Sequence, residues 1–274
     1  MIFKKFDFTP SMKTIQQFKS LYFINCIFKV MCLCLLISSC SARLNLTDIK
    51  KVKKVAIIGY DAKLNIEEEG ISLSYFRDRE LIKENAILAY QQMVTALAKK
   101  MGWEVVTYNN MISNSEYSAV YQEVLDKNIL ARMETSLGKL SMNYYPDGVI
   151  MGLYADNLSD DQRSRLYKSM GVDAIATAQI TITASSTTKV FFSSHIAYSA
   201  QVNFKLRNQT SDKPIWSDLM ATGKAADVSS GLNFGPVIVR NDDQKAFLQA
   251  IERGYVALLN RYDKAVDKNE RKSN

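Results

Sequence analysis

The most regular pattern in the chain is a strict alternation of apolar and polar residues over Val190–Leu206. Even-numbered positions in this stretch are mostly apolar and odd-numbered positions mostly polar, as in a β-strand with one face in water. Residues Ala174–Ala184 alternate in the same way, and the polar stretch Ser185–Lys189 joins the two. The pattern predicts a long antiparallel hairpin over residues 174–207, followed by a third strand from Ile215.

Other segments have the three-to-four-residue period of amphipathic helices. The longest are predicted at Arg79–Met101, where Gly102 is a helix stop, and at Asp242–Val266. The remaining predicted elements are strands at Lys53–Tyr60, Trp103–Tyr108, Gly148–Tyr154 and from Val172, and helices at Glu116–Leu140 and Ser159–Met170. We therefore expect an α/β fold with one mixed sheet of about five or six strands, including the long hairpin, packed by three to four helices.

The first forty residues have the order of charge, apolar run and small residues that is typical of a secretory signal. Five lysines and one aspartate are followed by the apolar run Val30–Ile37 and by Ser38 and Ser39. The sequence Ile37-Ser38-Ser39-Cys40 resembles the bacterial lipobox, in which the cysteine receives a thioether-linked lipid and becomes the first residue of the mature chain. An ordinary signal peptide, or an apolar helix that contains cysteines by chance, is the alternative.

Cleavage before Cys40 sets the expected domain boundaries. Residues 1–39 would be a lipoprotein signal peptide, 40–50 a lipidated tether, 51–266 a single α/β domain and 267–274 a polar tail. All four cysteines lie at or before Cys40, so the mature domain would contain neither a free thiol nor a disulfide. A domain of this length buries enough surface to fold without one.

The net charge is +7, but residues 1–39 hold five lysines and one aspartate, so about +3 remains after cleavage. The basic residues are dispersed and no basic stripe is interleaved with aromatic residues, which argues against nucleic-acid binding. A mildly basic chain is compatible with an anionic surface as partner.

Catalytic chemistry finds little support in the sequence. The single histidine, His195, is expected on the polar face of the hairpin, and no G-x-S-x-G motif accompanies it. One histidine cannot complete a zinc site, and the consecutive carboxylates of Glu67–Glu69 lack the spacing that wraps calcium. We expect no catalytic residue, no metal and no cofactor beyond the covalent lipid, with an envelope hydrolase that uses a carboxylate pair as an alternative.

Several motifs together resemble the CsgG, LpoB and TolB amino-terminal-domain group of envelope lipoproteins. They are KKVAII from Lys53, SMGVDAIATAQI from Ser169, YSAQVNFKLRN from Tyr198 and IWSDLMATGKA from Ile215, followed by the last helix. The resemblance covers about Lys51–Val266 and implies a non-enzymatic domain that binds a partner. The sequence departs from the channel-forming branch, which has two membrane hairpins per subunit, and it lacks the Pro-rich tether of the synthase activators.

We therefore expect a lipid-anchored, non-enzymatic protein of the bacterial envelope that faces the periplasm, at the outer membrane, and binds another envelope protein or itself. Candidate partner contacts are Phe234 and Val237 in a predicted turn. The alternative is a subunit of an oligomeric CsgG-like secretion channel, in which the hairpin enters the bilayer. Its interfacial aromatic residues would then be Phe191, Phe192, Tyr198 and Phe204, because membrane strands need about 9 to 11 residues of such alternation.

Overall fold

The computed structural model describes residues 42–66, 79–128, 143–190, 193–211, 213–223, 226–229 and 241–273. The described residues belong to one compact unit.

One mixed sheet forms the centre of this unit. Its strands are β1 (Arg43–Leu44), β2 (Lys54–Ile66), β3 (Glu104–Val105), β4 (Asn143–Tyr144), β5 (Ala174–Val190), β6 (Ser193–Asn208), β7 (Trp216–Thr222) and β8 (Ala226–Ser229). They follow the order β1-β7-β6-β5-β2-β3, with β4 paired to β2 and β8 paired to β6. Strand β2 runs parallel to β3 and β5, and the other pairs are antiparallel. The predicted fold class is confirmed, and β1, β4 and β8 are short strands beyond the expected ones.

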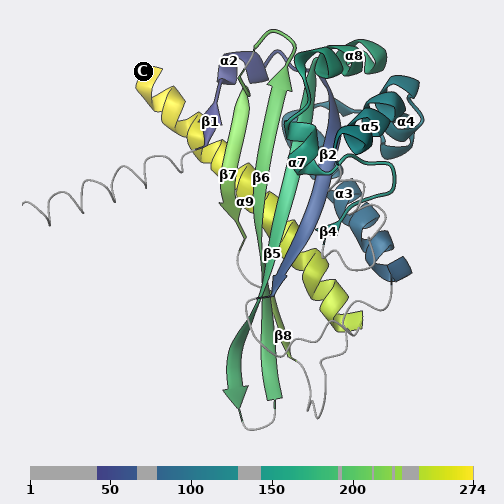
Figure 1. The fold of residues 1–274 in the computed structure, drawn as a ribbon. Helices are drawn as coiled ribbons and strands as arrows, with labels where there is room; N and C mark the ends of the chain where they lie inside the picture. The colour runs from purple at the N-terminus through teal and green to yellow at the C-terminus, as the bar shows by residue number, and fades with distance from the viewer. Residues whose placement is uncertain are drawn as a thin grey trace, which may run out of the picture. The chain divides into compact units, whose positions relative to one another are not determined.

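The hairpin of β5 and β6 follows the predicted alternation. Ala178 lies opposite Phe204 and Ile180 opposite Val202, and all four side chains are buried. The odd-numbered neighbours on both strands are only partly buried. The hairpin is longer than expected, because β5 continues through the predicted turn at Ser185–Lys189 to Val190, with one register shift between Ser186 and Thr188. Figure 1 shows this distal part of the hairpin projecting beyond the helices.

The helices lie unequally on the two faces of the sheet (Figure 1). They are α2 (Leu46–Ile49), α3 (Arg79–Met101), α4 (Tyr108–Ile112), α5 (Ser115–Lys127), α7 (Gly152–Asp156), α8 (Asp160–Met170) and α9 (Asn241–Ser273). Tyr60 of β2 packs against Tyr90 of α3, and Gly254 of α9 approaches Ala200 and Val202 of β6. Since Tyr60, Ala178 and Phe204 are cross-strand neighbours, α3 and α9 cover the same face.

The core is densest where α9 crosses β6 and β7. Trp216 is fully buried and its ring contacts those of Phe204, Trp103 and Tyr262 at centroid distances of 4.8, 6.5 and 4.9 Å. Beside it, Asp218 is also fully buried and accepts a hydrogen bond of 2.7 Å from Arg261 Nε on α9. These contacts hold α9 against β7 at Arg261 and Tyr262.

The strand predicted at Gly148–Tyr154 is wrong, apart from a single bridge at Ile150. Ile150 makes one parallel bridge to Gly59, and the chain then turns into α7. The turn is stabilised because Gly152 N–H donates to Asp61 Oδ1 over 2.7 Å. Helix α7 lies so close to β2 that a Cβ on Gly59 would come within 2.2 Å of Ala155 Cβ. A second predicted strand, Trp103–Tyr108, is reduced to β3 because Thr107 caps α4.

The predicted tether and tail also differ from the structure. Residues expected to form a free tether instead form β1, which pairs with β7, and α2, whose Ile49 is buried. The cause is the apolar Leu44 and Ile49, which pack in or against the core. The polar tail predicted at 267–274 continues α9 as helix to Ser273.

Asp173, in the turn before β5, joins the starts of two parallel strands. Its Oδ2 accepts the backbone N–H groups of Lys53 and Lys54, each over 2.9 Å, and its own N–H donates to Lys54 O. The hydrogen bonds from Lys54 and Lys53 hold the pKa of the Asp173 carboxyl below its usual value. The GVDAI stretch of the sequence therefore has a structural role at this junction.

We expect Asp173→Asn to lower the free energy of unfolding at neutral pH by less than about 1 kcal/mol, because the carboxylate is exposed and solvent screens it. A carboxyl whose pKa is lower in the folded state stabilises above its unfolded pKa of about 4, and this contribution is lost as pH falls through the folded pKa. The difference between the two proteins should therefore shrink as the pH of urea titrations falls below about 4 and through the folded pKa.

Candidate functional site

The structure describes only two of the predicted contact residues. Cys40, Phe191, Phe192, Phe234 and Val237 lie outside the described residues. Tyr198 and Phe204 are 2% and 0% exposed and belong to the core. Both point to the helix-covered face of the sheet, so in this structure they do not form an exposed aromatic rim.

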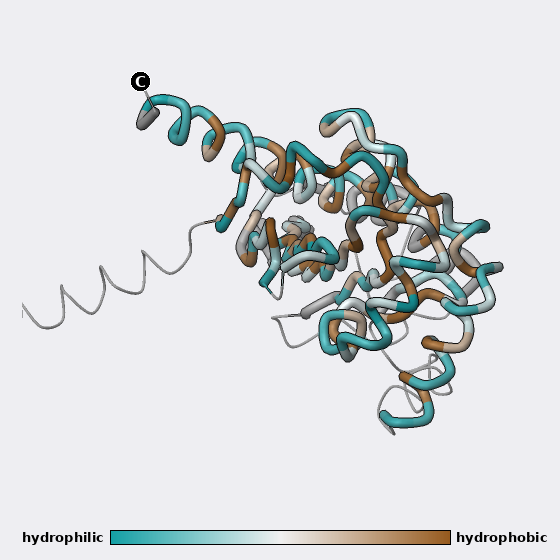
Figure 2. Tube along the Cα trace, turned by 90° about the horizontal axis from the view of Figure 1, so that it is seen from above, coloured by the Kyte–Doolittle hydropathy of each residue, from teal (hydrophilic) through white to brown (hydrophobic). Residues whose placement is uncertain are grey.

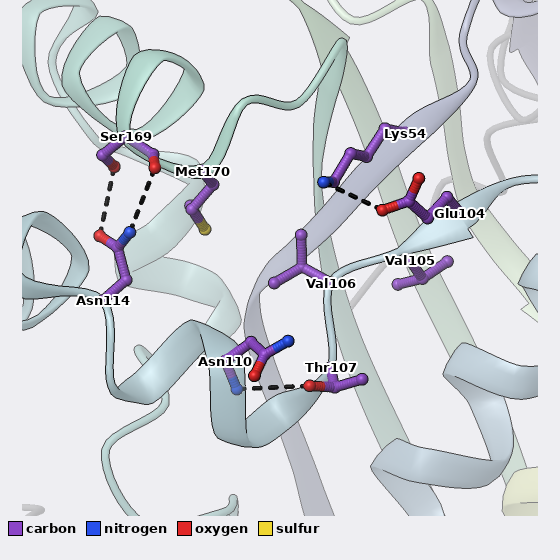
Figure 3. A pocket seen from close by; sticks show the side chains of 9 residues that line it. All are labelled: Lys54, Glu104, Val105, Val106, Thr107, Asn110, Asn114, Ser169 and Met170. Atoms are coloured by element: carbon purple, nitrogen blue, oxygen red, sulfur yellow. Dashed lines mark hydrogen bonds and ion pairs between the residues drawn. The ribbon is translucent and has the colours of Figure 1, made fainter.

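A pocket of about 350 Å³ opens at the start of β2 (Figure 3). It is lined by Lys54, Glu104, Val105, Val106, Thr107, Asn110, Asn114, Ser169 and Met170. These residues come from the first residues of β2 and β3, the starts of α4 and α5, and the end of α8. This pocket could not be predicted from the sequence, because its residues come from five elements that meet only in the folded chain.

Most polar groups of this pocket form hydrogen bonds or ion pairs with one another. Lys54 Nζ pairs with Glu104 Oε1 at 2.9 Å, and Thr107 Oγ1 caps α4 by accepting Asn110 N–H. Asn114 and Ser169 exchange hydrogen bonds of 3.2 and 3.3 Å. The arrangement fits a junction between elements and offers no pair of groups poised for proton transfer.

Large pKa shifts belong to buried tyrosines on β2, α3 and α5. Burial raises the pKa of Tyr60, Tyr90 and Tyr117 well above the usual value, so all three stay neutral. Tyr90 donates to Ile57 O over 3.0 Å and Tyr117 to Ile58 O over 2.8 Å. Since both hydroxyls bond to the backbone of β2, they position the strand and do not face a cleft.

Neither metal ligands nor membrane helices are found in the part of the chain that the structure describes. No three His, Cys, Asp or Glu side chains there are grouped closely enough to hold a metal ion. No helix among the described ranges is long and apolar enough to cross a bilayer.

The face of the sheet opposite α3 and α9 carries partly buried polar side chains of β5 and β6. Gln179 of β5 lies opposite Asn203 of β6, and Thr181 lies opposite Gln201. Gln201 Nε2 donates to Leu219 O of β7 over 3.0 Å. We call Leu153, Gln179, Thr181, Gln201, Asn203 and Leu219 the open face, and Figure 1 shows this side of β6 and β7 without a covering helix.

Two leucines stand at opposite sides of this open face. Leu219 is 50% exposed on β7, and Leu153 is 57% exposed on α7. Helix α7 sits directly over Gln179, since a Cβ on Gly152 would meet Gln179 Cγ at 2.6 Å. The strands β5 and β7 are two spacings apart, about 10 Å. The open face thus combines apolar margins with a strip of uncharged polar groups between them.

Ionic contacts fix α7 at the margin of the open face. Asp156 forms ion pairs with Lys205 and with Arg207, both of β6, the latter at 3.6 Å. The polar strip was predictable from the alternation, but Leu153 and Leu219 were missed. The sequence signal for Leu219 was misleading, because its neighbour Asp218 is the one that is buried.

Comparisons with known proteins give only distant likenesses. No protein-family model matches the chain, and no curated protein matches it. Among solved structures, lipoprotein GNA1162 from Neisseria meningitidis is 12% identical, with 73% of this chain and 95% of that chain covered and a TM-score of 0.28. A neuraminyllactose-binding hemagglutinin homolog from Helicobacter pylori is 10% identical, with 81% and 89% covered and a TM-score of 0.35.

Proposed function

We propose that this protein is a lipid-anchored, non-enzymatic component of the bacterial envelope that binds another envelope protein, or a second copy of itself, through the open face. The observation that carries the proposal is the pair of exposed leucines beside a strip of amide and hydroxyl side chains on the uncovered side of the sheet. Apolar contacts at the margins with hydrogen-bonding groups between them suit a protein partner.

The sequence before the domain supports the anchoring part of the proposal. Ile37-Ser38-Ser39-Cys40 has the order of a lipobox and follows directly on the apolar run. Bacterial lipid modification adds two or three acyl chains, which hold a protein to a bilayer far better than one. We place the anchor at the outer membrane with the domain in the periplasm.

Site-specific photo-cross-linking in intact cells tests the binding part. A benzophenone side chain at Leu219 or at Leu153 should give one discrete cross-linked product, because both positions lie at the proposed contact. The same group at Leu88 is the matched control, since Leu88 is 41% exposed on α3 and lies on the other side of the sheet. Its cross-links should be absent or non-specific.

The size of the product identifies the partner. A product that contains a second envelope protein, or one twice the mass of the chain, supports the proposal. Leu219→Asp should reduce that product severalfold in cross-linking from position 153, because a buried charge at an interface is costly. Equal products from Leu219, Leu153 and Leu88, or none from any of them, would contradict the proposal.

A channel subunit is the second candidate, favoured by the distal hairpin that projects beyond the helices in Figure 1. Strands β5 and β6 have 17 and 16 residues, more than a membrane strand requires. A closed ring of subunits would give a ladder of cross-linked multiples of one chain. That result, in place of a single product, would favour the channel.

A further inference from the structure

The domain begins almost directly after the proposed lipid. Arg43 is already part of β1, paired with Ser217 of β7, and Asn45 N–H donates to Ile215 O over 2.7 Å. Three residues of extended chain, from Cys40 to Arg43, span at most about 11 Å. A lipid on Cys40 would therefore hold this end of the domain within the reach of the headgroups.

Positive charge is concentrated at the same end. Residues 42–54 contain five basic side chains and one acid, net +4, and residues 264–273 contain four basic and two acidic side chains, net +2. Since the chain from Cys40 onward holds about +3, the rest of it is net −3. The protein thus has a basic end and an acidic remainder.

Contacts place the two segments together. Leu44 of β1 pairs with Trp216, and the Trp216 ring packs against Tyr262 of α9 at 4.9 Å. The last turns of α9, from Lys264 to Ser273, continue past this contact. Figure 2 looks down onto this end and shows those turns as mostly hydrophilic and extending outward. Lys213 adds a further cation two residues before Ile215.

Four of these cations have no carboxylate partner among the residues that the structure describes. Lys51 pairs with Asp48 and Lys54 with Glu104, each at 2.9 Å. By contrast, Arg43, Lys50, Lys53 and Lys213 are exposed and form no ion pair with any residue that the structure describes. We call Arg43, Lys50, Lys51, Lys53, Lys213 and the last turns of α9 the basic end.

We infer that the basic end rests on anionic lipid headgroups of the bilayer that holds the anchor. The inference depends on the proposed lipidation for its orientation, because the short chain brings this end, and no other, to the surface. Each basic side chain near an anionic bilayer strengthens attachment by a factor of about five, and salt screens the effect. The contact would turn a flexible anchor into a defined orientation.

Lysine acetylation of the purified lipidated protein in vesicles tests this inference. The protein is reconstituted into phosphatidylcholine alone or into a roughly 3:1 mixture of phosphatidylcholine and phosphatidylglycerol, and acetylation is followed by mass spectrometry. Lys50, Lys51, Lys53 and Lys213 should react about fivefold more slowly in the anionic vesicles, and high salt should restore their rates. Lys63, Lys127 and Lys245, exposed elsewhere on the domain, should react equally in both.

Two triple variants with the same net charge show whether the position of the lysines, and not the net charge, causes the protection. Replacing Lys50, Lys51 and Lys53 with glutamine should remove the protection of Lys213, whereas replacing Lys63, Lys127 and Lys245 with glutamine should leave it unchanged. Equal rates in both vesicles, with lipid confirmed on Cys40, would overturn the inference.

An amino-terminal peptide without lipid would instead overturn the proposed anchoring. Sedimentation with vesicles would then test whether the basic end binds anionic lipid without an anchor. Protein that pellets with phosphatidylglycerol vesicles but not with phosphatidylcholine vesicles would support the basic end as a lipid-binding surface. Protein that pellets with neither would overturn it.

Discussion

Replacing Cys40 with alanine should abolish lipid attachment and leave residues 1–39 on the chain, because the proposed modification precedes cleavage at this cysteine. In the unaltered protein, mass spectrometry of the amino-terminal peptide should show Cys40 as the first residue with acyl chains attached. A second variant carries an ordinary cleavable signal directly before Ser41 and therefore lacks Cys40. It should move almost entirely to the soluble fraction after a high-salt wash, because the acyl chains supply most of the membrane affinity.

Cys34→Ala is the matched control for this prediction, because Cys34 lies within the apolar run of the signal and would be removed with it. It should leave the mature mass and the membrane fraction unchanged. An unmodified amino terminus in the unaltered protein, or a chain starting at Ser41 that stays with membranes in high salt, would contradict the lipobox interpretation.

Trp216→Ala should lower the free energy of unfolding by about 3–5 kcal/mol, the cost of deleting a large aromatic side chain from a packed core. Trp216 is 0% exposed, and its ring contacts those of Trp103 just before β3, Phe204 of β6 and Tyr262 of α9. Its loss should loosen α9 and the β1 edge together. Urea titration should show a lower midpoint, and a changed slope would reveal a partly unfolded native state.

Two substitutions serve as controls for Trp216→Ala. Trp216→Phe should cost much less, because it keeps an aromatic ring and removes an indole N–H that is buried without a hydrogen-bond partner among the described residues. Leu219→Ala, three positions along β7 and half exposed, should change stability by no more than about 0.5 kcal/mol. If Trp216→Ala cost as little as Leu219→Ala, the proposed role of this aromatic cluster would be wrong.

The sheet was predictable where one periodicity extended over many residues. The alternation of β5 and β6 is set by one buried and one wet face, and such a pattern is visible without knowledge of the partners. The two-residue strand β1 could not be found in this way, because Arg43 and Leu44 adopt strand geometry only through pairing with β7. Helix α7 was missed for a similar reason, since it depends on Asp61, ninety-one residues earlier in the chain.

The open face was only half predictable. Polar residues such as Gln201 and Asn203 follow from the alternation of β6. Strand β7 breaks the simple rule, because Asp218 is buried and Leu219 is exposed. The hydrogen bond from Arg261 of α9 offsets part of the cost of burying that carboxylate. No local pattern in β7 indicates this partner, which is forty-three residues away. The exposure of Leu219 is thus set by the assembled sheet and not by a local sequence pattern.

With the proposed anchor at Cys40, the register of the long hairpin would set the height of its far end above the membrane. Arg43 lies level with Ser217, Lys205 and Thr177 across four strands, and β5 continues thirteen residues from Thr177 to Val190. At 3.3 Å per residue the hairpin therefore ends about 43 Å from the anchored strand. With the basic end on the headgroups, the ribbon would stand as a rigid spacer. A partner that contacts the far end of this ribbon would therefore bind at a fixed distance from the lipid surface.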